Sequence, residues 1–392
     1  MESVIFAIVQ LCTLAVMLIY GKKLSIANSN KQYWKTAVIP LLTYGFAYGL
    51  RFGRLVDWNP YYLRYVRLGN NMNLEDYEWV FEHICHYLYQ LGIPYFGFIF
   101  LQCLFFMFSI LLLFSINKDI VKWGLPVAFI FGAGNEMFIR FYMGFSFSII
   151  AIYFLLRKDI SYKQRYFWSI CFAFLGGQTH SACYFILPIV LTSRLLDIKM
   201  ISWQVSIPIL FLTTFVFNIS QFTFLTDIAN QVTVLSGGSD FQGSGYLDHM
   251  DELIAGDFMS VGYMTSSFQT KIRTFCYIAP AFYYSSKLIR KDSLDVFLYN
   301  IFVIGAILDP CFGTVELLNR ISRAMVFLGC IPYALWYVNA FKKNKRNSRE
   351  FYLALISVFF LLYPYLNDAF LRPESKGLLF IWDANGRNYL PF

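Results

Sequence analysis

The chain has 392 residues, of which 58% are apolar, 20% aromatic and only 14% charged. Soluble domains average roughly 45–50% apolar and about 25% charged residues, so a soluble globular fold is excluded, as are the disordered and collagen-like classes. The net charge of +8 raises the question of an anionic partner, and the answer depends on where the charges lie. An integral membrane protein is the class that remains.

Apolar stretches recur along the whole chain, which predicts one all-α polytopic membrane domain over residues 1–392. A helix crosses the hydrocarbon core in about 20 apolar residues, and the alternating pattern of a membrane barrel is absent from the sequence. The pair of spans that meets near Gly176 and Gly177 has the least distinct boundary. About twelve transmembrane helices are expected, at residues 3–20, 36–50, 95–116, 122–134, 138–156, 166–179, 181–196, 203–219, 272–288, 294–309, 321–340 and 351–367.

Lysine and arginine gather in every second connection between these spans. Cytoplasmic loops of membrane proteins carry such an excess, so both termini are predicted to be extracytoplasmic. Two long connections then lie outside, residues 51–94 and residues 220–270, and the second is an acidic, glycine-containing loop expected to form a lid. The net charge therefore records topology and does not indicate nucleic acid.

The first outside segment is expected to form two short helices at the membrane interface. Asn59 followed by Pro60 is typical of a helix start. Asn73 is expected to begin a second, amphipathic helix that carries Glu78 and Glu82 on its polar face.

Candidate residues for sugar chemistry lie in this segment and at the end of a later span. Asp57 is either a general base or an ion-pair partner of a neighbouring arginine, and His180 is a base, a hydrogen-bond donor or a polar helix end. Histidine and cysteine spacings match no metal motif, so neither a metal nor a cofactor is predicted. Flat aromatic faces suit sugar rings, although an interfacial aromatic belt gives the same pattern, at Trp58, Tyr61 and Tyr62.

Ten arginines fall on the predicted outside, against the positive-inside tendency. Guanidinium binds phosphate in a bidentate geometry that lysine cannot reproduce, whereas snorkelling to lipid headgroups is the alternative explanation. Several of these arginines stand at the ends of spans near one depth, which predicts an outward-facing site for a di-anionic ligand. They are Arg51, Arg54, Arg140, Arg320 and Arg323.

Short motifs accompany these residues. Residues 51–57 read RFGRLVD and precede Trp58, residues 135–140 read NEMFIR and precede Phe141, and residues 179–182 read THSA. With Glu78 and a late arginine, they resemble the R-x-G-x-x-x-D-Y, N-x-x-R-Q, F-H-x-S-A and E-P-x-F patterns of the EpsG family of bacterial membrane proteins. That family is related to the Wzy-type polysaccharide polymerases. The likeness covers about residues 45–340, and the Tyr, Gln, Phe and Pro of those patterns are absent here.

The resemblance implies a metal-independent polymerase of surface polysaccharide in the bacterial inner membrane. It would transfer a glycan chain from undecaprenyl pyrophosphate onto a lipid-linked repeat, alongside membrane lipid, a flippase and a chain-length regulator. The five arginines would hold pyrophosphate, and Asp57 or His180 would deprotonate or orient the attacking hydroxyl. The glycan would contact the outside aromatics and acids, Trp58, Tyr61, Tyr62, Glu78 and Glu82.

Two other functions fit parts of the same pattern. A flippase for lipid-linked oligosaccharide should place ionisable residues deep in its spans on a path to both faces, whereas the charges here cluster at the span ends. A membrane acyltransferase that modifies glycans could use His180, but its acyl donor would arrive from the inside, where the sequence places no histidine.

Overall fold

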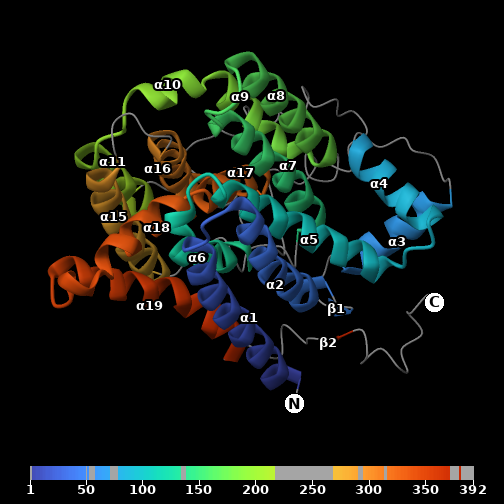
Figure 1. Ribbon diagram of the computed structural model, residues 1–392, viewed down its shortest axis with the longest axis horizontal. Coiled ribbons are helices and arrows are strands. Elements are labelled where there is room, and N and C mark those ends of the chain that lie inside the picture. Colours follow the sequence, from blue (N-terminus) through green and yellow to red (C-terminus); the bar gives the residue numbers. More distant parts are fainter. Residues whose placement is uncertain are drawn as a thin grey trace. The chain divides into compact units, whose positions relative to one another are not determined.

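The structure is a computed structural model that describes residues 2–49, 51–52, 58–70, 78–133, 138–216, 268–289, 295–312, 316–370 and 379–380. The chain divides into two compact units, here called unit 1 (Met1–Val190 with Leu361–Phe392) and unit 2 (Leu191–Phe360). Helices dominate both, as Figure 1 shows, and the predicted all-α class is confirmed. The predicted acidic loop at 220–270 lies almost wholly outside the described residues.

Helices occupy each of the predicted membrane segments, most of them within a few residues of the expected bounds. The range 181–196 differs most, because it is divided among a 3-10 helix and two short α-helices that part at Thr192. The count of about twelve crossings stays a prediction. In the described part of the chain, five stretches are long and apolar enough to cross a membrane, namely Ala7–Ser25, Tyr95–Phe114, Ile139–Leu156, Leu318–Ala340 and Arg349–Leu366.

Unit 1 contains the N-terminal helices and the two short helices of the first outside segment. A two-residue antiparallel pair joins β1 (Arg51–Phe52) to β2 (Leu379–Phe380). Its helices are α1 (Glu2–Ser25), α2 (Asn30–Gly49), α3 (Trp58–Gly69), α4 (Trp79–Gln90), α5 (Tyr95–Phe114), η1 (Lys118–Ile120), α6 (Val121–Phe131), α7 (Ile139–Leu156), α8 (Tyr162–Thr179), η3 (Ser181–Phe185) and α9 (Ile186–Leu191), whose last residue belongs to unit 2.

Two glycines set how closely α7 and α8 approach. A Cβ on Gly144 would lie 2.9 Å from the Gly176 carbonyl oxygen, and a Cβ on Gly176 would lie 2.9 Å from the Gly144 carbonyl oxygen. Small residues at a crossing let membrane helices pack backbone to backbone. The same crossing places His180, the residue after α8, beside the first turns of α7, with its Cβ 3.3 Å from where a Gly144 Cβ would stand.

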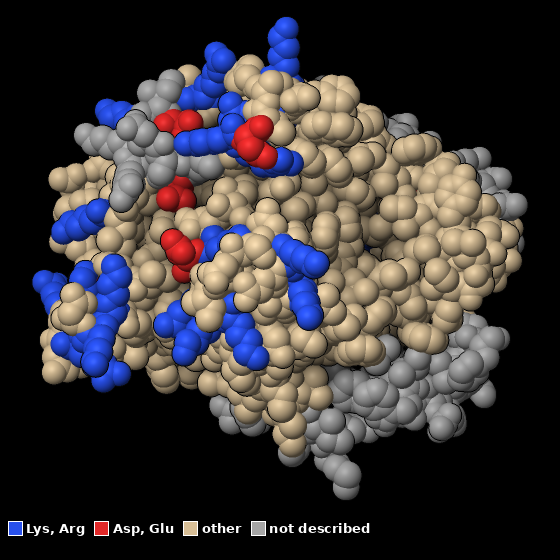
Figure 2. Space-filling model, viewed as in Figure 1, with Lys and Arg blue, Asp and Glu red and all other residues tan. Residues whose placement is uncertain are grey.

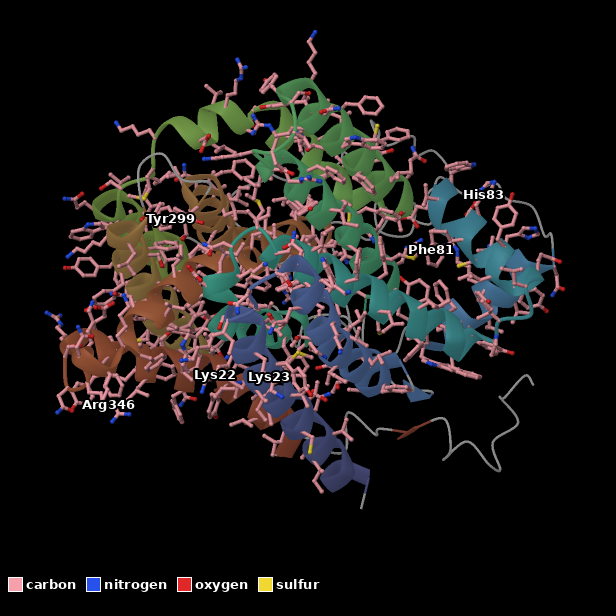
Figure 3. All side chains as sticks on the ribbon, viewed as in Figure 1. Lys22, Lys23, Phe81, His83, Tyr299 and Arg346 are labelled. Atoms are coloured by element: carbon pink, nitrogen blue, oxygen red, sulfur yellow. The ribbon has the colours of Figure 1, made fainter. Side chains whose placement is uncertain are left out.

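Unit 2 is built around α16, which packs against the helices before and after it. Lys22 and Lys23 lie in the last turn of α1 of unit 1, and Arg346 directly follows η7 (Lys343–Lys345) of unit 2, so the basic residues predicted between the spans are found at helix ends in both units (Figure 3). The elements of unit 2 are α10 (Ser193–Ile198), α11 (Trp203–Phe211), the π-helix η4 (Leu212–Val216), α15 (Phe268–Leu288), α16 (Asp295–Phe312), α17 (Glu316–Phe327), α18 (Cys330–Ala340), η7 (Lys343–Lys345) and α19 (Arg349–Phe370), whose last residues belong to unit 1.

A glycine also sets the central crossing of unit 2. A Cβ on Gly305 of α16 would lie 2.4 Å from the Cβ of Met325 on α17. At the other end of α16, Asn300 hydrogen-bonds the carbonyls of Leu196 and Lys199 and so fixes the connection between α10 and α11. The close crossing determines which side chains of α16 and α17 can meet one turn further on.

Candidate functional site

Two glutamates one turn apart on α4 face the interior of unit 1. Glu78, which precedes the first turn, is 3% exposed, and Glu82 is 1% exposed. A buried carboxylate is costly unless a charge and hydrogen bonds compensate it. The acids predicted to face a glycan therefore need partners inside the protein.

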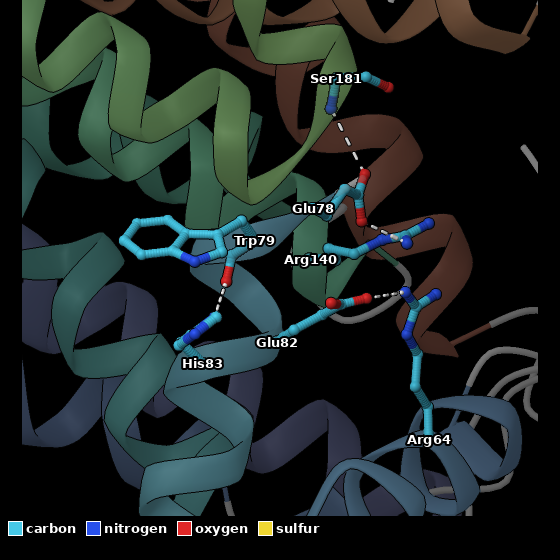
Figure 4. Close-up of polar contacts among 7 residues, drawn as sticks. All are labelled: Arg64, Glu78, Trp79, Glu82, His83, Arg140 and Ser181. Atoms are coloured by element: carbon cyan, nitrogen blue, oxygen red, sulfur yellow. Dashed lines mark hydrogen bonds and ion pairs between the residues drawn. The ribbon is translucent and has the colours of Figure 1, made fainter. Parts of the chain in front are cut away.

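Those partners are arginines from two neighbouring helices. Arg64 of α3 donates to Glu82 across 3.1 Å, and Arg140 of α7 forms an ion pair with Glu78 (Figure 4). Arg140 is the second residue of α7, where the helix dipole disfavours a cation. The Glu78 carboxylate offsets that unfavourable position, so the two ion pairs hold α4 to α3 and to the start of α7.

Aromatic rings complete the surroundings of the guanidinium groups. The Arg140 guanidinium carbon lies 5.7 Å from the centre of the Tyr61 ring and 6.0 Å from that of Phe81, and Arg140 also donates a hydrogen bond to the Tyr61 hydroxyl oxygen. Arg64 lies 5.9 Å from the Phe81 ring centre. Phe81 itself is 2% exposed, on the inner side of α4 (Figure 3). Such cation–π contacts orient a guanidinium without neutralising it.

A backbone donor reaches the same carboxylate from a third direction. The N–H of Ser181, the first residue of η3, donates to Oε1 of Glu78 at 3.4 Å (Figure 4). Burial raises the pKa of Glu78, although Arg140 and Arg64 act in the opposite direction. A guanidinium and a backbone N–H that converge on one carboxylate form the donor set of an anion site.

His180 stands next to this donor set. Its ring is 3% exposed and lies edge-on to Phe141, with ring centres 5.6 Å apart. Nδ1 accepts a hydrogen bond from the N–H of Ala182 at 3.1 Å. This bond assigns the proton of the neutral ring to Nε2, so His180 presents a donor. Its geometry suits orientation of an oxygen better than removal of a proton.

A family model matches this chain over residues 33–376, which includes every residue of the site. The chain belongs to the EpsG family. Membership and the long apolar helices together mark an integral membrane protein with a polysaccharide polymerase role. Figure 2 agrees with this assignment, because large areas of the face it shows carry no charged side chain. Neither the curated proteins nor the solved structures contain a match.

The structure brings together only part of the site predicted for this EpsG-family protein. Arg140, Glu78, Glu82 and His180 meet in unit 1, whereas Arg320 and Arg323 lie on α17 of unit 2. Asp57 and Arg54 lie outside the described residues, and of Arg51 only the backbone, in β1, is described.

The predicted aromatic platform is largely an internal cluster. Trp58 is 4% exposed, stacked on Tyr62 with ring centres 5.6 Å apart, and edge-on to Tyr95 at 5.2 Å. Tyr61 and Tyr62 are half-buried, and Tyr61 faces Arg140. Tyr61 is therefore the aromatic that lies beside the charged groups.

Sequence reasoning missed two participants in this candidate site. Arg64 is one of the ten arginines on the predicted outside for which the sequence indicates no role. Glu78 and Glu82 lie four residues apart, so that on a helix they share one face, and two buried carboxylates on one face need two cations. The Ser181 N–H carries no side-chain signal at all. His83 stands apart, because its Nδ1 lies 2.8 Å from the carbonyl oxygen of Trp79 in its own helix (Figure 4).

Proposed function

We propose that this EpsG-family protein lengthens a surface polysaccharide at the outer face of the bacterial cytoplasmic membrane. It transfers a glycan chain from undecaprenyl pyrophosphate onto a second lipid-linked repeat. The observation that carries the proposal is the convergence of the Arg140 guanidinium and the Ser181 N–H on one buried carboxylate, that of Glu78.

The proposed pyrophosphate site is the place that this carboxylate occupies. Phosphate oxygens accept from the same donors, and they can engage guanidinium in a bidentate way. Burial raises the pKa of Glu78, so burial makes its charged form less favourable. An incoming di-anion can therefore compete with the Glu78 carboxylate for Arg140. Arg51 and Arg54 shortly precede α3 in the chain, and we assign them to this anion site from the sequence alone.

The proposed reaction is a displacement at an anomeric carbon. A hydroxyl oxygen of the acceptor sugar forms a bond to that carbon while the bond to the pyrophosphate oxygen breaks, and its electron pair leaves with the pyrophosphate. Arg140 and the Ser181 N–H stabilise the developing charge. The hydroxyl proton passes to a base, for which Asp57 is the candidate in this part of the chain, while His180 orients an oxygen through Nε2–H.

Replacement of Arg140 tests the site. We expect Arg140→Ala to abolish polymer while the lipid-linked single repeat still accumulates. Arg140→Lys should restore only part of the polymer, because lysine lacks the planar guanidinium that binds phosphate in a bidentate way. Glycan chain length is read on gels, and protein amount is measured by immunoblot. Arg67→Ala is the matched control, since Arg67 is an exposed arginine one turn after Arg64 on α3. Normal chain length in Arg140→Ala at normal expression would refute the assignment.

Purified protein in liposomes separates this function from the alternatives. A polymerase lengthens the lipid-linked repeat when that repeat is the only substrate supplied. A flippase moves the repeat between leaflets without lengthening it, and an acyltransferase leaves chain length unchanged and requires an acyl donor. Chain growth in liposomes supports the proposal, and either of the other outcomes contradicts it.

A further inference from the structure

A single carboxylate lies far along the central helix of unit 2. α16 begins at Asp295 and carries Asp309 near its other end, about 21 Å away at 1.5 Å per residue. The basic residues before α16 place its start on the predicted cytoplasmic side, so Asp309 is predicted to lie toward the outer face. An ionisable group in an apolar, membrane-length helix is costly and marks a candidate functional position.

The position of Asp309 is fixed by the close crossing of α16 and α17. Gly305, one turn before it, allows the two helices to touch, and Ser322 of α17 then hydrogen-bonds Oδ1 of Asp309 at 2.9 Å. Ser322 is fully buried, and its hydroxyl is shared with the carbonyl of Asn319 at 3.0 Å. In the described part of the chain, Ser322 is the only hydrogen-bond donor to this carboxylate.

Positive charge and a phenol flank the carboxylate from two helices. Arg323, which follows Ser322 on α17 and is exposed, interacts electrostatically with Asp309. Tyr277 of α15 interacts with Asp309, Arg323 and Arg273. These five residues, which we call the Asp309 cluster, join the three helices α15, α16 and α17 and are not used by the reaction proposed for unit 1. They are Arg273, Tyr277, Asp309, Ser322 and Arg323.

We propose that the Asp309 cluster is a glycan-binding site, in which the carboxylate accepts hydrogen bonds from sugar hydroxyls and Arg323 contacts a phosphate of the same lipid-linked repeat. Asp309 is half-buried as a residue, and in the described part of the chain the hydrogen bond from Ser322 engages only Oδ1 of its carboxylate. A metal ion is a poorer occupant, because one carboxylate beside guanidinium groups lacks the oxygen ligands that hard cations need. This inference rests on the proposed polymerase function and adds a second substrate contact to it.

The test measures steady-state kinetics of purified protein in liposomes, with lipid-linked repeat extracted from cells that lack this protein. We expect Asp309→Asn to raise KM for the repeat about tenfold, with kcat within twofold, because a neutral amide binds hydroxyls less strongly than a carboxylate does. Ser322→Ala should raise KM about threefold. Asp295→Asn changes an acid at the opposite end of the same helix, and it should leave KM unchanged.

Thermal unfolding of the same variants separates binding from folding. If Asp309→Asn unfolds at the wild-type temperature and its KM is raised, the inference stands. If KM equals that of wild type, or rises only together with a lowered unfolding temperature that Asp309→Glu also shows, the carboxylate is structural and the inference fails. The proposed function fails separately, when Arg140→Ala polymerises normally or wild-type protein does not lengthen the repeat.

Discussion

The two units place carboxylates against arginines in different ways. In unit 1, Glu78 directly precedes α4, a helix of 12 residues outside the predicted spans, and Glu82 lies in its first turn. Each is paired with an arginine of another helix. In unit 2, Asp309 belongs to α16, a helix of 18 residues, and is held by a serine across a tight crossing. At a short helix held by ion pairs, a substrate anion can replace the glutamate as the partner of the arginine. A carboxylate fixed in a long helix keeps its position whether or not a substrate is bound.

The largest effect is expected from breaking the main ion pair of unit 1. Glu78→Ala leaves Arg140 facing an emptied, largely buried position, and the expected loss of unfolding free energy is about 3 kcal/mol. Denaturant unfolding of the detergent-solubilised protein measures it. In a double-mutant cycle with Arg140→Ala, the two losses should fall short of additivity by at least about 1 kcal/mol. Additive losses would show that the pair is not coupled, and the exchange of anions proposed for unit 1 would lose its basis.

An intermediate effect is expected at the glycine crossings. A methyl group on Gly144 or on Gly305 meets closely packed atoms of the neighbouring helix, so each change to alanine should cost about 2 kcal/mol. Gly97→Ala is the control. Its Cβ would meet the end of the Ile93 side chain near the start of α5, that side chain can move aside, and alanine favours the helix more than glycine does. Thermal unfolding of the three variants checks the order. If all three variants unfolded at the same temperature, the close approach of the helices at Gly144 and Gly305 would not be what positions the two sites.

The smallest effect is expected at an exposed ion pair, which sets the scale for the buried ones. A hydrogen bond from Arg157 lowers the pKa of Asp159 to about 2. The stabilisation it gives is present above the ordinary aspartate pKa and is lost as the pH falls through about 2. Because Asp159 is fully exposed, Asp159→Asn should unfold at the wild-type temperature at pH 7. A clearly lower unfolding temperature would mean that exposed ion pairs stabilise this protein more than expected. The difference in stabilisation between this pair and the Glu78–Arg140 pair would then be smaller.

Much of the helical architecture could be predicted from sequence because hydrophobic runs are local signals. The predicted spans 95–116 and 138–156 correspond to α5 and α7 nearly residue for residue. The division of 181–196 into three pieces was not predicted, although Pro188 lies within this range and removes one helical hydrogen bond. Arg140, Glu78 and His180 were all chosen from sequence, and they do lie together, but the pairing of Glu78 with Arg140 was not foreseen.

The sequence by itself therefore determined the membrane class, the helix positions and the residue types that carry charge, because each depends on overall composition or on apolar runs within one continuous segment. Tertiary structure decided which charges meet. The approach of α7 to α8 at Gly144 brings His180 and the Ser181 N–H to the start of α7, and the approach of α16 to α17 at Gly305 brings Ser322 to Asp309. Such contacts join residues far apart in the chain, and they depend on how closely two helices approach, which no local pattern encodes.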